Sequence, residues 1–195
     1  MQNKTSNIKI PKEVTIFLDM DGVLVNFFST ISEMAGVDHY RKISKLKLKS
    51  IIHEITGTDF FYHLPKTKHA DSIINLILSI KEEYGIISSP LIGDEKNTEF
   101  HKKRWIKDNL LKKPFVIHIK KDKKEYAISP EGFRNILIDD RGANITDWEK
   151  AGGIGIKFQS DEDHLEKISE GLLRAQDIYE KKIEFVPQKL FSREM

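Results

Sequence analysis

Two pairs of aspartates in this sequence could do chemistry, because each pair follows a short apolar stretch. Asp19 and Asp21 follow residues 14–18, and Asp139 and Asp140 follow residues 134–138. Both stretches are typical of buried strands that end in a loop. Ligands of open parallel sheets bind beyond the carboxyl ends of the strands. If both strands are central in one sheet, we expect four carboxylates to converge on one place.

Four converging carboxylates repel one another unless a cation neutralises them, and Mg²⁺ suits oxygen ligands and phosphate. With the phosphate charge offset, one carboxylate could attack phosphorus. An acid two residues on, in a loop turned at Gly22, could protonate the leaving alkoxide. A single aspartate more often caps a turn or a helix. Two pairs, each after a buried-type strand, favour the chemical role.

Apolar periodicity predicts the elements that would position these acids. We expect strands over residues 14–18, 86–90, 114–119, 134–138 and 153–158, and helices over 71–83, 97–111 and 145–150. Ser160 with Asp163 resembles a capping box that opens a last helix, to about residue 182. This alternation predicts an α/β fold with a mostly parallel sheet covered on both faces. Residues 27–70 break the alternation and are typical of small helices in an inserted cap.

The overall composition is that of an ordinary globular chain. It has 195 residues, no cysteine and a formal net charge of +2, so disulfides and thiolate metal sites are excluded. The charge alone does not indicate a nucleic-acid partner. Residues 1–12 lack the apolar run of a secretory signal, and no stretch approaches a membrane span. We therefore expect a cytoplasmic protein with no membrane partner.

Three motifs, in this order, resemble those of the haloacid dehalogenase (HAD) phosphatases. They are Asp19-Met-Asp-Gly-Val-Leu24, Ile86-Ile-Ser-Ser-Pro90 and Ile136-Leu-Ile-Asp-Asp140. The resemblance implies a Rossmannoid sheet with a helical cap after the first strand. It implies that Asp19 is the nucleophile and Asp21 the general acid and base. It also implies phosphate binding by Ser88 and Ser89, and Mg²⁺ binding by Asp19, Asp21 through its carbonyl, and Asp140 or, as second choice, Asp139.

The family pattern also needs a lysine that holds the phosphate and the nucleophile together. Asp122-Lys123 matches the context of that lysine in one branch of the family, so Lys123 is the first choice. Lys102 is the second choice and a candidate phosphate ligand, because Lys102-x-x-Trp105 also resembles that branch. Lysine runs are otherwise most often solvated turns.

That branch is the 5′(3′)-deoxyribonucleotidases and their bacterial and phage-like relatives. The resembling residues are Asp19 to Phe27, Asp59-Phe-Phe61, Ser88-Ser-Pro90 and Leu137 to Arg141. The resemblance implies that Phe27, Phe60 and Phe61 stack on a nucleobase, a contact with a physical basis in the ring faces. These aromatic residues could equally be the core of the cap.

The sequence therefore predicts a core of residues 1–26 and 71–195, a cap of residues 27–70, and a Mg²⁺-dependent nucleotidase. Three alternatives stay open. The substrate could be a polynucleotide 3′-phosphate end, held by the lysine-rich insertion over residues 41–49. It could be another small phosphate ester. The chain could also be a non-catalytic HAD-like binding module, although the intact Asp19, Asp21 and Asp140 argue against that. The oligomeric state is not predicted.

Overall fold

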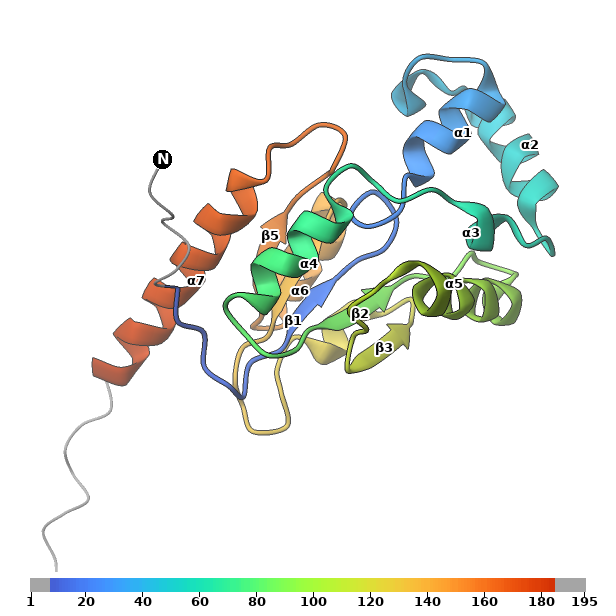
Figure 1. The fold of residues 1–195 in the computed structure, drawn as a ribbon. Helices are drawn as coiled ribbons and strands as arrows, with labels where there is room; N and C mark the ends of the chain where they lie inside the picture. Colours follow the sequence, from blue (N-terminus) through green and yellow to red (C-terminus); the bar gives the residue numbers. More distant parts are fainter. Residues whose placement is uncertain (1–7, 185–195) are drawn as a thin grey trace, which may run out of the picture.

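A five-stranded parallel sheet is the centre of the computed structural model, which describes residues 8–184 (Figure 1). The strands are β1 (Ile16–Leu18), β2 (Gly85–Ser88), β3 (Val116–Ile119), β4 (Ile136–Asp139) and β5 (Ile154–Lys157), in the order β3-β2-β1-β4-β5. Leu18 of β1 pairs with Ile138 of β4. The two acidic pairs therefore leave adjacent central strands at the same edge, and the predicted parallel α/β sheet is confirmed.

Helices cover both faces of the sheet because side chains of a strand alternate between faces. Ile16 and Leu18 belong to a core shared with α4 (Ala70–Leu78) and α7 (Glu166–Glu184). Phe17 points to the other face and packs with Trp148 of α6 (Gly142–Lys150). The helix α5 (Glu95–Asn109) connects β2 to β3 and buries Trp105.

Between β1 and α4 the chain forms four short helical segments: α1 (Phe27–Ala35), the 3₁₀ turn η1 (Tyr40–Lys42), α2 (Lys45–Ile55) and α3 (Phe60–His63). The first three share a small core around Ile31, Ile51 and Ile55, beyond the carboxyl edge of the sheet (Figure 1). The fourth, α3, is fastened to α5, where Asp108 accepts a 3.0 Å hydrogen bond from Tyr62 Oη.

This arrangement has the helical character predicted for residues 27–70, but the division into a core and a separate cap stays a prediction. Residues 1–7 and 185–195 of the predicted core lie outside the described residues.

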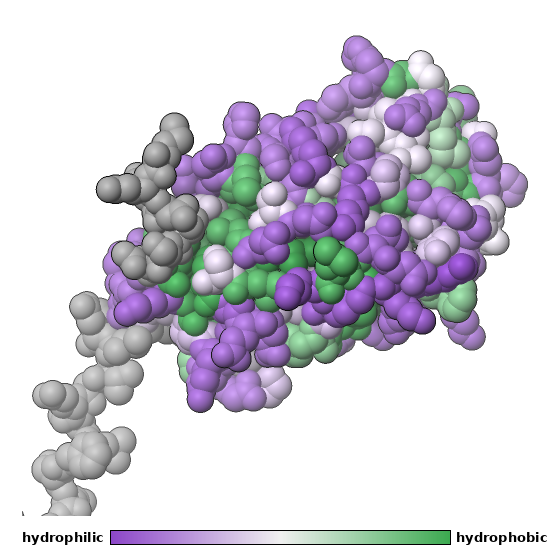
Figure 2. All heavy atoms as spheres, viewed as in Figure 1, coloured by the Kyte–Doolittle hydropathy of each residue, from purple (hydrophilic) through white to green (hydrophobic). Residues whose placement is uncertain are grey.

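Along residues 8–184, no helix is both long enough and apolar enough to cross a membrane. Hydrophilic residues cover most of the face drawn in Figure 2.

The predicted capping box at Ser160 and Asp163 is wrong, because α7 begins only at Glu166. Ser160 instead donates its backbone N–H to the carbonyl of Gly22, at 2.9 Å. Asp163 accepts the backbone N–H of Gln159 at 2.8 Å. These bonds hold the segment after β5 as a loop against the Asp19 loop, which competes with helix formation. The predicted helix over 71–83 is also shorter than expected, since α4 ends at Leu78.

Candidate active site

Three buried carboxylates meet where β1 and β4 end. Asp139 is the last residue of β4, Asp140 follows it, and Asp19 follows β1. Each offers an oxygen atom, and these oxygens all lie within 4.8 Å of one another. Three of the four carboxylates that the sequence predicted to converge therefore meet in the fold, whereas Asp21 is not part of this group.

Lys123 bridges two of these acids from the start of the 3₁₀ turn η2 (Lys123–Tyr126). Its Nζ lies 2.9 Å from Asp19 Oδ1 and 2.6 Å from Asp139 Oδ2. Burial alone would lower the pKa of Lys123, but the charges of Asp19 and Asp139 outweigh it and raise that pKa. An ammonium group has three protons to donate. Lys123 therefore keeps one for a further acceptor beside Asp19.

Asp139 and Asp140 have different surroundings although they are neighbours. Asp139 Oδ1 accepts the backbone N–H of Arg141 at 2.8 Å, and Asn144 Nδ2 donates to both Asp139 oxygens at 3.0 Å. Asp140, which is 6% exposed, has no side-chain hydrogen bond or ion pair to any residue in 8–184. Its burial and the charges of Asp19, Asp139 and Asp21 raise the pKa of Asp140 to about 9. Asp140 is the acid whose charge is least compensated by the protein.

Asp21 is held from behind by Lys102, which lies on α5. Lys102 is fully buried, and its Nζ donates to Asp21 Oδ2 at 2.7 Å, to Ser88 Oγ at 2.9 Å and to the Ser89 carbonyl at 2.9 Å. The ring of Phe61 covers this ammonium, 5.0 Å from Nζ to the ring centroid. Burial raises the pKa of Asp21, and the charge of Lys102 opposes that shift. Asp21 Oδ1 is buried without a hydrogen-bond partner among residues 8–184.

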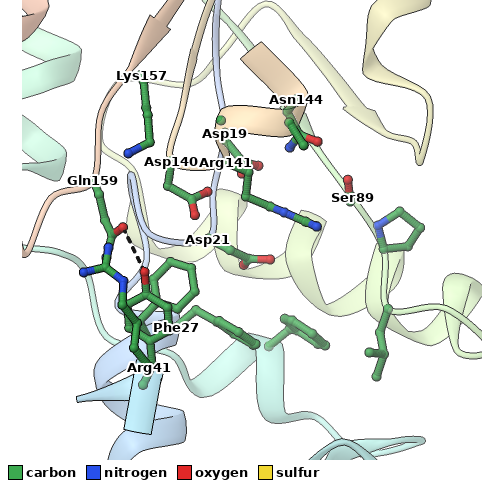
Figure 3. Close-up of a pocket in the computed structure, with 17 residues that line it drawn as sticks. Asp19, Asp21, Phe27, Arg41, Ser89, Asp140, Arg141, Asn144, Lys157 and Gln159 are labelled. Atoms are coloured by element: carbon green, nitrogen blue, oxygen red, sulfur yellow. Dashed lines mark hydrogen bonds between the residues drawn. The ribbon is translucent and has the colours of Figure 1, made fainter. Parts of the chain in front are cut away.

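A cavity of about 540 Å³ opens in front of these groups, between the sheet edge and the helices that follow β1 (Figure 3). Residues of the sheet edge and residues of the helices after β1 both line it: Asp19, Asp21, Phe27, Phe28, Tyr40, Arg41, Phe61, Ser89, Pro90, Leu91, Asp140, Arg141, Gly142, Ala143, Asn144, Lys157 and Gln159. Ser89 therefore faces the cavity, whereas Ser88 is fully buried behind it and accepts from Lys102. Lys102 and Lys123 do not line the cavity either.

The structure does not bring all three predicted stacking rings to the cavity. Phe27 and Phe61 line it, with parallel rings whose centroids are 6.2 Å apart. Phe60 points elsewhere and meets the Phe61 ring edge-on at 5.3 Å. Phe60 is absent from the cavity lining, and its ring packs instead against the small core around Ile31, Ile51 and Ile55. Phe28 and Tyr40 supply further ring surface.

Contacts from η1 reach across the cavity to the loop after β5. Tyr40 Oη donates to Gln159 Oε1 at 3.4 Å, the contact drawn dashed in Figure 3. Arg41 forms an ion pair with Glu162 at 2.9 Å. Sequence reasoning did not assign eleven of the lining residues to the site, among them Phe28, Tyr40, Arg41, Asn144, Lys157 and Gln159. Phe28 had a local signal, its place beside Phe27, whereas Tyr40, Lys157 and Gln159 reach the cavity through tertiary contacts.

Comparison with known proteins gives a fold likeness at low identity. No protein-family model matches the chain, and a search of curated proteins finds no match. Similar solved structures include a haloacid dehalogenase-like family hydrolase from Streptococcus pneumoniae, with 12% identity, a TM-score of 0.45, and coverage of 87% of this chain and 100% of that one. Another is a HAD-family enzyme from Bacteroides thetaiotaomicron, an Asp-to-Ala mutant in complex with magnesium and inorganic phosphate. It has 14% identity, a TM-score of 0.43, and coverage of 78% of this chain and 97% of that one.

Proposed function

We propose that this protein is a Mg²⁺-dependent phosphomonoester hydrolase of the HAD type, which forms an aspartyl-phosphate on Asp19. One observation carries the proposal. Asp19 lies at the floor of a cavity with Asp140 beside it and the Lys123 ammonium 2.9 Å from its carboxylate. Asp19 and Asp140 come from the first and third of the HAD-like motifs, and Lys123 comes from the separate Asp122-Lys123 context. A non-catalytic binding module would have no use for a nucleophile and a proton donor that line the same cavity.

In the proposed reaction, an Asp19 oxygen forms a bond to phosphorus while the bond to the leaving oxygen breaks. Asp21, in its protonated form, donates a proton to that leaving oxygen. Water then attacks the aspartyl-phosphate, and Asp21 takes back a proton from this water. The products are the alcohol, inorganic phosphate and Asp19 in its starting form. Lys123 holds Asp19 and offers its remaining proton to a phosphate oxygen, and the Ser89 hydroxyl faces the same space.

The residues present fit a hard divalent cation. The donors are carboxylate oxygens, and Asp140 forms no ion pair with a lysine or arginine within 8–184, so its oxygens are available to a cation. Asp19 and Asp140 would hold the ion, with the Asp21 carbonyl as a third ligand. Asp139 is the less suitable ligand because Lys123, Asn144 and Arg141 already use its oxygens. When bound, Mg²⁺ supplies charge neutralisation at the phosphoryl group.

For the substrate we propose a nucleoside monophosphate, as the resemblance to deoxyribonucleotidases implies. The cavity is within the size range of small-molecule sites. The aromatic side chains of Phe27, Phe28, Tyr40 and Phe61 belong to its lining and offer apolar surface to a base. The contacts of Tyr40 and Arg41 across the cavity favour a small ligand over a polynucleotide end, which is the alternative substrate.

A phosphate-release screen tests the proposal directly. With Mg²⁺, the protein should release phosphate from nucleoside monophosphates, and chelation by EDTA should abolish this activity until Mg²⁺ is restored. Release from a 3′-phosphorylated oligonucleotide but from no mononucleotide would replace the substrate with the alternative. No release from any nucleotide, sugar phosphate or aryl phosphate would contradict the proposed activity itself.

A further inference from the structure

We infer that Lys102 is a positioning residue that holds the proton donor Asp21 in place, with Ser88 as its anchor, and does not itself bind the phosphate. This inference rests on the proposed function. It gives Lys102 and Ser88 a task different from the phosphate binding that sequence reasoning assigned to them.

The first argument is the hydrogen-bond capacity of Lys102. A lysine ammonium has three protons. All three are directed at protein oxygens within 2.9 Å: Asp21 Oδ2, Ser88 Oγ and the Ser89 carbonyl. No proton is left for a phosphate oxygen. Lys123, by contrast, has two carboxylate partners among residues 8–184, which leave one of its protons for a further acceptor.

The second argument is location. Lys102 and Ser88 are both fully buried behind Asp21 and Ser89, which belong to the cavity lining. Lys123 also lies outside the lining, so what separates the two lysines is that Lys102 has all three protons bound by the protein. The Phe61 ring covers the Lys102 ammonium. A phosphate in the cavity would therefore meet Asp21 and Ser89 first, with Lys102 in the layer behind them.

The third argument is electrostatic. A buried ammonium is costly unless a charge pairs with it, and Asp21 is the only carboxylate within salt-bridge distance of Lys102 among residues 8–184. Removing one partner of a buried pair leaves the other uncompensated. Because Lys102 is fixed by Ser88 and by α5, its bond to Oδ2 fixes the direction of the Asp21 carboxyl group.

This arrangement predicts an effect that depends on the leaving group. A misplaced proton donor slows the release of basic alkoxides, which need a proton, but hardly slows the release of acidic phenols, which depart as anions. A lost phosphate ligand would slow both alike. The two roles of Lys102 are therefore separable by kinetics.

The experiment measures the phosphorylation step, as the burst of released alcohol or phenol, for Lys102→Met with Mg²⁺. The substrates run from dinitrophenyl phosphate through phenyl phosphate to an alkyl phosphate. We expect the rate for the alkyl ester to fall about 10²–10⁴-fold, which is the usual contribution of general acid catalysis. The rate for dinitrophenyl phosphate should fall less than about fivefold. Lys123→Met is the matched control, and it should slow all these substrates to a similar degree. A uniform loss with Lys102→Met would overturn the inference.

Ser88→Ala provides a second test should Lys102→Met not fold, because it removes only one anchor of the lysine. It should show the same leaving-group pattern at smaller amplitude, and a uniform loss would again contradict the inference. In an Asp21→Asn protein, adding Lys102→Met or Ser88→Ala should lower the phosphorylation rate of the alkyl ester by less than about threefold more, because the proton donor is already absent. Failure of the wild-type protein to hydrolyse any of these esters would instead refute the proposed function.

Discussion

Asp140→Asn should stabilise the metal-free protein although it removes a proposed metal ligand. In the folded chain, burial and the neighbouring acids raise the pKa of Asp140 from 3.8 to about 9. At pH 7 the folded protein must therefore bind a proton at Asp140 that the unfolded chain has released. This lowers the free energy of unfolding by about 1.4 kcal/mol for each pH unit above 3.8, so the loss of stability at pH 7 is at most about 4 kcal/mol. The clustered carboxylates share protons, so we expect a gain on the order of 1–3 kcal/mol from the neutral Asn.

The sign of the pH dependence follows from the same shift. Between its unfolded and folded pKa values, Asp140 binds more protons in the folded state, so its contribution to stability falls as the pH rises. The stability gain of Asp140→Asn should therefore be small near pH 5 and larger at pH 8. For a chain of this size, 1–3 kcal/mol corresponds to a Tm increase of about 2–12 °C.

Thermal unfolding in EDTA at the two pH values measures this effect. Asp147→Asn, on the exposed face of α6, is the matched control and should change the free energy of unfolding by less than about 0.5 kcal/mol. Added Mg²⁺ should raise the Tm of the wild type and have little effect on Asp140→Asn. An Asp140→Asn protein that is less stable than wild type in EDTA, or a gain that does not grow with pH, would refute the reasoning.

Two further predictions concern the cavity wall. Phe27→Ala should raise KM for a nucleoside monophosphate about tenfold or more, since base stacking contributes ~1–3 kcal/mol, and should leave p-nitrophenyl phosphate nearly unaffected. If steady-state assays showed an equal increase in KM for the two substrates, Phe27 would have a structural role and no specific contact with the base. Gly22→Ala should lower kcat at least tenfold, because Gly22 has φ +78° and an added Cβ would lie 2.5 Å from Phe28 Cε2. Circular dichroism checks that the Gly22→Ala protein is folded. An unchanged kcat in the folded protein would contradict this prediction, because it would show that the loop accommodates the added Cβ without moving Asp21.

The sheet and the acidic centre were predictable because both depend on local patterns. Apolar runs such as residues 136–138 mark buried strands, and parallel pairing brings their ends together whatever the intervening chain does. The Asp19 and Asp140 positions follow from those two rules. Lys123 had only a motif context, yet the fold places its ammonium between Asp19 and Asp139.

The rest of the site depends on tertiary contacts that no local pattern carries. Sequence reasoning made Lys102 a candidate phosphate ligand on the predicted helix 97–111, but the packing of α5 buries it completely. Tyr40 and Gln159 are far apart in sequence and meet only because the segment after β1 folds back over the sheet edge. Ser160 and Asp163 had the spacing of a helix cap, but bonds to the Gly22 loop and to Gln159 hold the segment as a loop.

The most direct test of the central claim is to trap the covalent intermediate on Asp19. A nucleoside monophosphate with a radiolabelled phosphate is mixed with the protein and Mg²⁺, quenched in acid within milliseconds, and the digested peptides are mapped. The account predicts an acid-stable, hydroxylamine-sensitive label on the peptide that contains Asp19, and neither label nor turnover in Asp19→Asn, which keeps the shape of the side chain. Normal turnover by Asp19→Asn, or a label on another residue, would contradict it.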